Sequence, residues 1–196
     1  GSKTFDDISN AVPPESQLGI YTRYLRISNS TITGNGSGIG LKISSNSALA
    51  DSIQYCTIVS NTIGVQVEGD DGTYNFLDNN FLSQGTYAIN NTNSRSITAT
   101  NSYWGTSDIE ELIYHGEDDL NYGYVTYLPS EPTPNTTAPI SPPTGVTQTS
   151  SSGNYVISWS ANPESDLSGY KIYYGGYTGY SFSNVKDVGN VTSYDM

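Results

Sequence analysis

Apolar residues recur through the first two thirds of the chain in two columns that run five residues apart. The columns are Ile27, Ile53, Phe76 and Ala99, and then Ile32, Ile58, Phe81 and Trp104. Successive members of a column are separated by 26, 23 and 23 residues. One such turn cannot enclose a core alone, whereas stacked turns can, so this period is typical of a repeat protein. We therefore expect coils in which equivalent apolar residues lie above one another.

A second strand follows these columns in three of the turns. Its segments are GIGLKI at 38–43, IGVQV at 63–67 and TYAIN at 86–90, which alternate apolar with small or polar residues as half-buried strands do. Between the two columns, the same position in four successive turns is occupied by Asn29, Tyr55, Asp78 and Asn101. An Asn at such a turn can bridge neighbouring coils through its side-chain amide. The prediction is parallel pairing from coil to coil.

The alternative is that the same segments are strands of an antiparallel sandwich. Tight hairpins would then join them, and the Asn-Gly pair is the strongest short signal for a hairpin. Asn35-Gly36 is the only such pair in the chain. The stacked coil is therefore favoured. Helical spacing is confined to SDIEELIY at 107–114, which predicts one short helix.

The run Ile97–Pro129 resembles the terminal segment of bacterial right-handed parallel β-helix repeat proteins. In that family the last coil commonly ends in a Trp-Gly pair after an Asn-rich turn, followed by an acidic stretch and a short strand leading to proline. The matching residues here are Asn101, Tyr103-Trp104-Gly105, Asp118-Asp119, and Tyr124 to Tyr127 before Pro129. The resemblance covers about residues 20–129 and implies a right-handed parallel β-helix over residues 1–128, with earlier turns preceding the visible ones.

Trp104 and Gly105 are expected to form the structural cap of this solenoid. Trp104 belongs to the second apolar column, so its indole would close the open end of the core. Solenoids need such a cap, because an open last coil leaves apolar surface and unpaired strand edges in water.

The rest of the chain divides into a linker and a second module. Residues 129–143 (PSEPTPNTTAPISPP) are rich in proline, which predicts an extended, semi-rigid linker. Residues 144–196 resemble a fibronectin type III domain, with Trp159 in YVISWS as the core tryptophan and YKIYY at 170–174 as the third strand. The family pattern continues beyond Met196, so the sandwich is interpreted as truncated. The remainder of a parent chain or a partner would then cover it.

Composition narrows the classes of partner. Asp and Glu outnumber Lys and Arg by 19 to 7, giving a formal charge of -12. Such a chain repels phosphate backbones and anionic membrane surfaces, which argues against nucleic acid and membranes as partners. Cys56 is the single cysteine, so an intrachain disulfide cannot form. Gly1-Ser2-Lys3 is typical of a tag remnant rather than a signal peptide.

Polysaccharide lyases and glycosidases often have this fold, but their catalytic groups are not evident. A lyase needs a base and cations for the uronate carboxylate. Lys42 is expected to point outward, and Gln66 and Asn90 occupy the same place on the next coils instead of further bases. Hydrolysis needs two or three carboxylates on one face. Asp70-Asp71 and Asp78 are the only clustered acids in the coils, and a solvated loop is the favoured interpretation of that run. We therefore expect no catalytic residue in this segment.

Two acidic runs are candidates for a structural Ca²⁺, since calcium binds several converging oxygens. The first is Asp70-Asp71, with Glu68 nearby, and the second is Asp118-Asp119, beside Glu117. Neither run has the spacing of a known calcium loop, so solvated turns are the alternative. No other cofactor is expected.

Tyr is the dominant aromatic residue, at 17 copies, and exposed Tyr rings can stack on sugar faces. Tyr55, Tyr74 and Tyr87 fall in successive coils and are the candidate carbohydrate contacts. Packing beside the turns is the alternative for each. The favoured function is a non-catalytic module of a bacterial secreted or cell-surface protein, acting as an adhesin, a spacer or a region that contacts a polysaccharide or surface glycan. The second hypothesis is an accessory C-terminal part of a polysaccharide lyase or glycoside hydrolase whose active coils lie upstream.

Overall fold

The computed structural model describes residues 25–33, 38–151, 153–162, 164, 166–178 and 181–196, without the side chains of 45–49, 70–71, 151 and 177–178. The chain forms two compact units, Gly1–Pro139 and Ile140–Met196. The division therefore falls inside the segment predicted as a linker. Strands and turns make up nearly all of the described chain. Where SDIEELIY predicts a helix, the structure has a single 3-10 turn, η2 (Glu110–Leu112).

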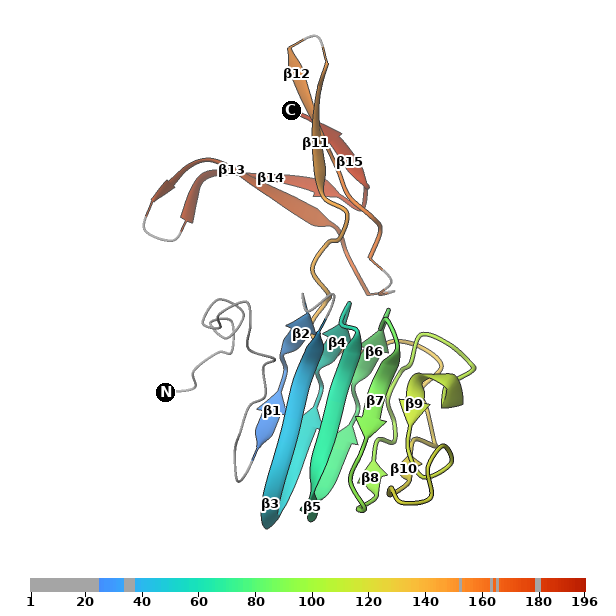
Figure 1. The fold of residues 1–196 in the computed structure, drawn as a ribbon. Coiled ribbons are helices and arrows are strands. Elements are labelled where there is room, and N and C mark those ends of the chain that lie inside the picture. Colours follow the sequence, from blue (N-terminus) through green and yellow to red (C-terminus); the bar gives the residue numbers. More distant parts are fainter. Residues whose placement is uncertain (1–24, 34–37, 152, 163, 165, 179–180) are drawn as a thin grey trace. The chain divides into compact units, whose positions relative to one another are not determined.

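The first unit is a solenoid of stacked coils. Its strands are β1 (Arg26–Ser28), β2 (Thr31–Thr33), β3 (Ile39–Gln54), β4 (Thr57–Val59), β5 (Ile63–Leu77), β6 (Asn80–Leu82), β7 (Tyr87–Asn91), β8 (Ile97–Thr98), β9 (Ile113–Tyr114) and β10 (Val125–Thr126). One sheet has the order β1-β3-β5-β7-β9, with β8 between β5 and β10, and the other is β2-β4-β6 (Figure 1). All of these pairs are parallel, so the antiparallel alternative is wrong for this unit.

The register confirms the first three members of both predicted columns. Ile27 pairs with Ile53, and Ile53 pairs with Phe76, and all three side chains are buried. In the second column Ile58 pairs with Ile32 on one side and Phe81 on the other. Each fully buried Ile or Phe contributes about 1.5–3 kcal/mol from the apolar surface it removes from water. The stacked columns are thus the main source of stability of the coil.

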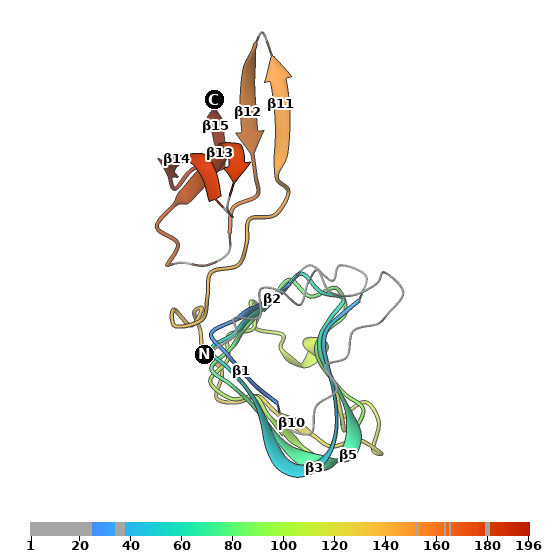
Figure 2. The same ribbon diagram turned by 90° about the vertical axis from the view of Figure 1, so that its left-hand side faces the viewer.

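Strands β3 and β5 are longer than the sequence pattern predicts. Each was expected as two short strands separated by a turn, whereas each runs unbroken around a corner of the coil (Figure 2). Because a parallel neighbour accompanies the bend, backbone pairing continues through it, with register shifts between Ser44 and Ala50. Gly69 and Gly72 in the same bend have φ of +99° and +146°. The segment EGDDG therefore lies within a strand and not in a free turn.

The polar position between the two columns forms a sharp turn of the backbone in each of these coils. Its four residues all have left-handed backbone conformations, with φ of 49° at Asn29, 53° at Tyr55, 59° at Asp78 and 57° at Asn101. Asn and Asp tolerate this region better than other residues with a side chain, which explains why they dominate the position. Tyr55 is the exception.

The side-chain amide that bridges neighbouring coils belongs to Asn79, one residue beyond this position. Asn79 is fully buried, and its Nδ2 donates to the Ile53 carbonyl at 2.9 Å while its Oδ1 accepts from the Cys56 N–H at 2.9 Å. On its other side, the Asn79 N–H donates to the Ser102 hydroxyl at 3.1 Å. Asn79 therefore satisfies backbone groups that the turn would leave unpaired inside the core.

The first part of the proline-rich segment lies against the coils. The Glu131 N–H donates to the Ser102 carbonyl at 3.0 Å. Asn135 is held through its N–H, which donates to Asn80 Oδ1 at 2.7 Å, and through its Nδ2, which donates to the Asp78 carbonyl at 2.7 Å. Residues 129–139 are thus part of the first unit.

The second unit consists of antiparallel strands. They are β11 (Thr147–Ser151), β12 (Asn154–Ser158), β13 (Tyr170–Thr178), β14 (Ser181–Gly189) and β15 (Ser193–Asp195), in the sheets β11-β12-β15 and β13-β14. Trp159 is buried and meets Tyr170 edge to face, with ring centroids 5.1 Å apart. The described chain is therefore all-β, with almost no helix.

Candidate functional site

The three tyrosines predicted to contact carbohydrate do not form one group. Tyr74 is completely buried beside Phe76, with ring centroids 6.4 Å apart, so neither face of its ring is open to a ligand. It stands two residues before Phe76 in β5 and therefore points into the same core. For Tyr74 the prediction is wrong.

Tyr55 and Tyr87 remain partly exposed, but they lie on different sides of the coil. Tyr55 occupies the left-handed turn position between β3 and β4. Tyr87 begins β7, where its neighbour on the preceding coil is Ile63. The three tyrosines fall in successive coils, which predicted that they lie near one another. They do not, because the side of the coil on which a residue lies depends on where its strand turns the corner.

Tyr87 instead belongs to a group with two tyrosines that the sequence did not single out. The ring of Tyr114 lies 5.6 Å from that of Tyr87 and 6.0 Å from that of Tyr122. Tyr87 and Tyr114 come from the neighbouring strands β7 and β9, and Tyr122 comes from the loop that precedes β10. All three are partly exposed. We call Tyr87, Tyr114 and Tyr122 the tyrosine face.

Acidic residues adjoin the tyrosine face. The pKa of the Tyr114 hydroxyl is raised, first by desolvation and then by the negative charges of Asp119 and Asp118. Asp118 accepts from the His115 N–H at 2.9 Å, and Asp119 accepts from the Asn121 N–H at 3.0 Å. The two carboxylates predicted as calcium ligands thus bind the backbone of their own loop. In the part of the chain that the structure describes, no three His, Cys, Asp or Glu side chains converge as metal ligands would.

The other acidic run is only partly described. Glu68 forms an ion pair with Lys42, with 2.8 Å between Oε1 and Nζ, and also accepts a hydrogen bond from Gln66. The side chains of Asp70 and Asp71 lie outside the described residues. The outward column is Lys42, Gln66, Asn90 and Tyr114, in that register. Lys42 therefore has a carboxylate partner and stands in a column with no second base.

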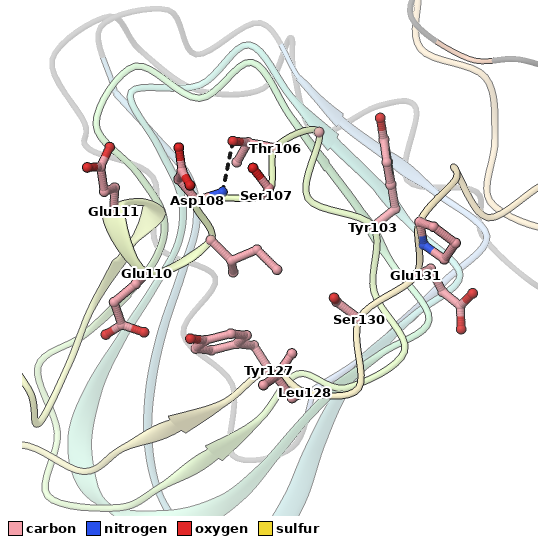
Figure 3. A pocket seen from close by; sticks show the side chains of 13 residues that line it. Tyr103, Thr106, Ser107, Asp108, Glu110, Glu111, Tyr127, Leu128, Ser130 and Glu131 are labelled. Carbon is pink, nitrogen blue, oxygen red and sulfur yellow. Dashed lines mark hydrogen bonds between the residues drawn. The ribbon is translucent and has the colours of Figure 1, made fainter.

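A cavity of about 800 Å³ lies at the C-terminal end of the coils, and we call it the end cleft (Figure 3). Asp108, Glu110 and Glu111 lie on the side of η2, and Tyr103 and Glu131 lie on the opposite side. Tyr127 is at the base between them. The hydroxyls of Thr106, Ser107 and Ser130 add further polar groups. The cleft thus combines aromatic rings, hydroxyls and carboxylates.

A buried histidine orders one wall of the end cleft. The Val125 N–H donates to His115 Nδ1 at 2.9 Å, so the ring proton is on Nε2, which donates to Glu110 Oε1 at 2.5 Å. The Tyr127 hydroxyl also bonds to Glu110, and this bond is the largest cause of its raised pKa, ahead of desolvation and the charge of Glu110. Glu110 is therefore held by two donors while its carboxylate stays partly exposed.

The second apolar column ends beneath this cleft, at Trp104. The indole is 2% exposed and meets the ring of Tyr127 edge to face, with centroids 6.3 Å apart. Gly105 follows with φ of +71°, a left-handed turn that suits glycine. Trp104 therefore supports Tyr127 from the core side.

Sequence reasoning missed every charged residue of the end cleft. Its lining residues come from two segments, 103–111 without Trp104 and 127–132 without Pro129, and these segments meet only because the last coil closes. The available signal was the neighbourhood of the acid-rich SDIEELIYHGEDD and the tyrosine-rich NYGYVTY. No spacing rule links such segments.

In the described residues no helix is long or apolar enough to cross a membrane. Comparisons of the chain with protein-family models, with curated proteins and with solved structures gave no match.

Proposed function

We propose that this chain is a non-catalytic, glycan-contacting module of a bacterial secreted or cell-surface protein. The observation that carries the proposal is the tyrosine face, in which Tyr114 lies 5.6 Å from Tyr87 and 6.0 Å from Tyr122. Neighbouring, partly exposed rings on the side of a solenoid offer a row of π faces to the C–H groups of successive sugar units.

The solenoid adds rigidity to this surface. Tyr87 and Tyr114 stand on paired strands, with the β9 backbone fixed to β7 through Ile89–Ile113 and Asn90–Tyr114. Rings held in this way lose little conformational entropy when a ligand binds, so more of the contact energy is available for affinity. A non-catalytic role agrees with the ion pair of Lys42 with Glu68, because Lys42 is the one base of the outward column.

For residues 144–196 we infer a fibronectin type III-like domain. The support is the buried Trp159, the edge-to-face contact of its ring with Tyr170, and the antiparallel pairing of β12 with both β11 and β15. In this proposal the second unit is a spacer. It makes no contribution to glycan contact.

A glycan array followed by calorimetry on the full chain tests the function. We expect Tyr114→Ala to weaken the best hit by about fivefold to tenfold, because one stacked ring is worth about 1–1.5 kcal/mol. Tyr114→Phe should bind within about twofold of wild type, since the ring and not the hydroxyl makes the contact.

The control is Tyr173→Ala, which removes a tyrosine that is 56% exposed in the second unit. Its binding should equal that of the unmodified chain. Failure of the chain to bind any glycan would contradict the proposal, and so would unchanged binding by a folded Tyr114→Ala variant.

A further inference from the structure

The segment 131–139, which we call the strap, runs back along the stacked coils. It contacts three successive coils, and the contacts in order along the strap are Glu131 with Ser102, Asn135 with Asn80, and Pro139 with Thr57. Asn80 pairs with Thr57 on the coil before it and forms a bridge to Tyr103 on the coil after it. The strap therefore begins beside the coil of Trp104 and ends two coils earlier.

Hydrogen bonds to the strap engage two buried polar side chains of the coils. Asn80 is 1% exposed, and its Nδ2 donates to the Asn135 carbonyl at 3.1 Å while its Oδ1 accepts from the Asn135 N–H at 2.7 Å. Thr57 is fully buried, and its hydroxyl donates to the Pro139 carbonyl. Ala138 of the strap is also buried. Because release of the strap breaks these bonds and exposes apolar surface, the docked state is favoured.

The strap is longer than the distance it covers, because part of it forms a turn. Asn135 begins this turn. Its carbonyl accepts from the Ala138 N–H at 3.2 Å, and its Oδ1 accepts from the Thr137 N–H at 2.9 Å. Two steps between coils span about 10 Å, whereas about eight residues of extended chain reach roughly 27 Å. Release of the strap therefore lengthens the chain by roughly 15–40 Å, depending on the direction of the pull.

Along the chain, the strap lies between the last strand of the solenoid and the second unit. That strand, β10, has two residues and pairs with the two residues of β8. So few backbone hydrogen bonds offer little resistance when one end of a strand is pulled. Tension that arises in the second unit meets the bonds of Asn80 and Thr57 first, and it reaches β10 only after they break.

We propose that the strap is a mechanical latch. While it is docked, it holds Pro139 at the coil of Thr57 and keeps tension away from β10. When it releases, the chain gains the length stored in the strap while the coils stay folded, and the strap docks again when the tension falls. The proposal rests on the role inferred above in a secreted or cell-surface protein, where a bound glycan can be pulled, but it concerns a different segment.

Single-molecule force spectroscopy on the full chain tests the latch. One handle is attached at Ser28→Cys, an exposed position of β1, and the other at Met196→Cys. Cys56 is fully buried and therefore takes up no handle. We expect a first, reversible step of roughly 15–40 Å before the coils open. Unfolding of the second unit, Ile140–Met196, gives a step above about 100 Å and is thereby distinguished.

A second pulling geometry is the matched control. The handle at Met196 is moved to Leu128→Cys, which is 61% exposed and precedes the strap in the chain. Tension then bypasses the strap, so the short step should disappear. A short step in this geometry would overturn the proposal, and so would its absence when the chain is pulled from Met196.

Asn135→Asp weakens the latch without removing its turn. The carboxylate still accepts from the Thr137 N–H, but the Nδ2 that donates to the Asp78 carbonyl at 2.7 Å is lost. The short step should occur about fivefold to tenfold faster at a given force, because one hydrogen bond is missing. Thr133→Ala, at an exposed position of the strap, should leave the rate unchanged.

An unchanged rate in a folded Asn135→Asp variant would show that these bonds do not hold the strap, and the proposal would fail. The pulling experiment contains no glycan. Its result is therefore independent of the tyrosine face, and a glycan-array result that depends on Tyr114 would stand whether or not the latch exists.

Discussion

The indole of Trp104 lies face to face on the ring of Phe81, with centroids 4.5 Å apart and planes inclined by 17°. This contact continues the column Ile32, Ile58 and Phe81 by one further layer. A solenoid core is open at its ends unless a large side chain covers the last layer. The stack therefore joins the repeating core to the residues of the end cleft above it.

Replacement of Trp104 tests this end of the core. Trp104→Ala should lower the free energy of unfolding of the first unit by about 3–5 kcal/mol, because the indole is buried and leaves a cavity. Urea unfolding followed by circular dichroism measures the loss. Trp104→Phe is the control and should lose clearly less, because a ring still covers Phe81. A loss below about 1 kcal/mol for the alanine variant would show that the core does not depend on this layer.

Asn79 should be among the most sensitive polar positions. Asn79→Ala removes the side-chain oxygen that accepts from the Cys56 N–H and the side-chain NH₂ that donates to the Ile53 carbonyl. Two buried backbone groups then lose these hydrogen bonds. The expected loss is about 2–4 kcal/mol in chemical denaturation. Asn121→Ala, at an exposed position that bonds to Asp119 of its own loop, should change stability by less than about 0.5 kcal/mol. Similar losses for both variants would refute the bridging role of Asn79.

Tyr55 is expected to reduce the stability of its turn. Its φ is 53°, and the equivalent position in the other coils holds Asn29, Asp78 or Asn101. Tyr55→Asn should raise the free energy of unfolding by about 0.5–1 kcal/mol, because Asn adopts the left-handed region at lower cost. Tyr55→Val should lower it, since a β-branched residue is least compatible with that backbone. Thermal unfolding of the two variants measures these opposite changes. If Tyr55→Asn lowered the stability, the packing of the Tyr55 ring would outweigh the cost of its left-handed backbone.

Because the Cys56 thiol is buried, we expect the free energy of unfolding to fall in alkaline solution. Burial raises the pKa of its thiol from 9.0 to about 11, against the weaker opposite effect of hydrogen bonds to the backbone of Ser30 and Gln54. The unfolded chain therefore ionises first, and the folded state loses on the order of 2–3 kcal/mol as pH rises from 9 to 11. Below pH 9 both states hold the proton and the effect vanishes.

The measurement is the free energy of unfolding of the unmodified chain and of Cys56→Ala at pH 8, 9, 10 and 11. The difference between the two proteins should shrink across this window, because the alanine variant has no thiol to ionise. Native Cys56 should also react slowly with a disulfide reagent at pH 8, and rapidly after unfolding. A pH-independent difference or fast native labelling would disprove the burial argument.

The sequence by itself determined the coil. Its period placed Ile27, Ile53 and Phe76 one above another, and the paired backbones place them in that register. Residue chemistry also marked the turn, since Asn and Asp accept a left-handed backbone. These features are local or strictly periodic, so they are visible without knowledge of how distant segments meet.

Tertiary structure decided the rest. Strand β5 runs unbroken through a corner, so Tyr74 lies in the same strand as Phe76. Residues two apart in a strand point to the same side, and Tyr74 is therefore buried in the core with Phe76. Asn135 bonds to Asp78 and Asn80 across more than 50 residues of chain, and no composition rule for a proline-rich segment predicts this docking. The tyrosine face and the end cleft arise in the same way. Their side chains become neighbours only when the last coil closes, because side-chain proximity depends on the path of the backbone in space and not on spacing along it.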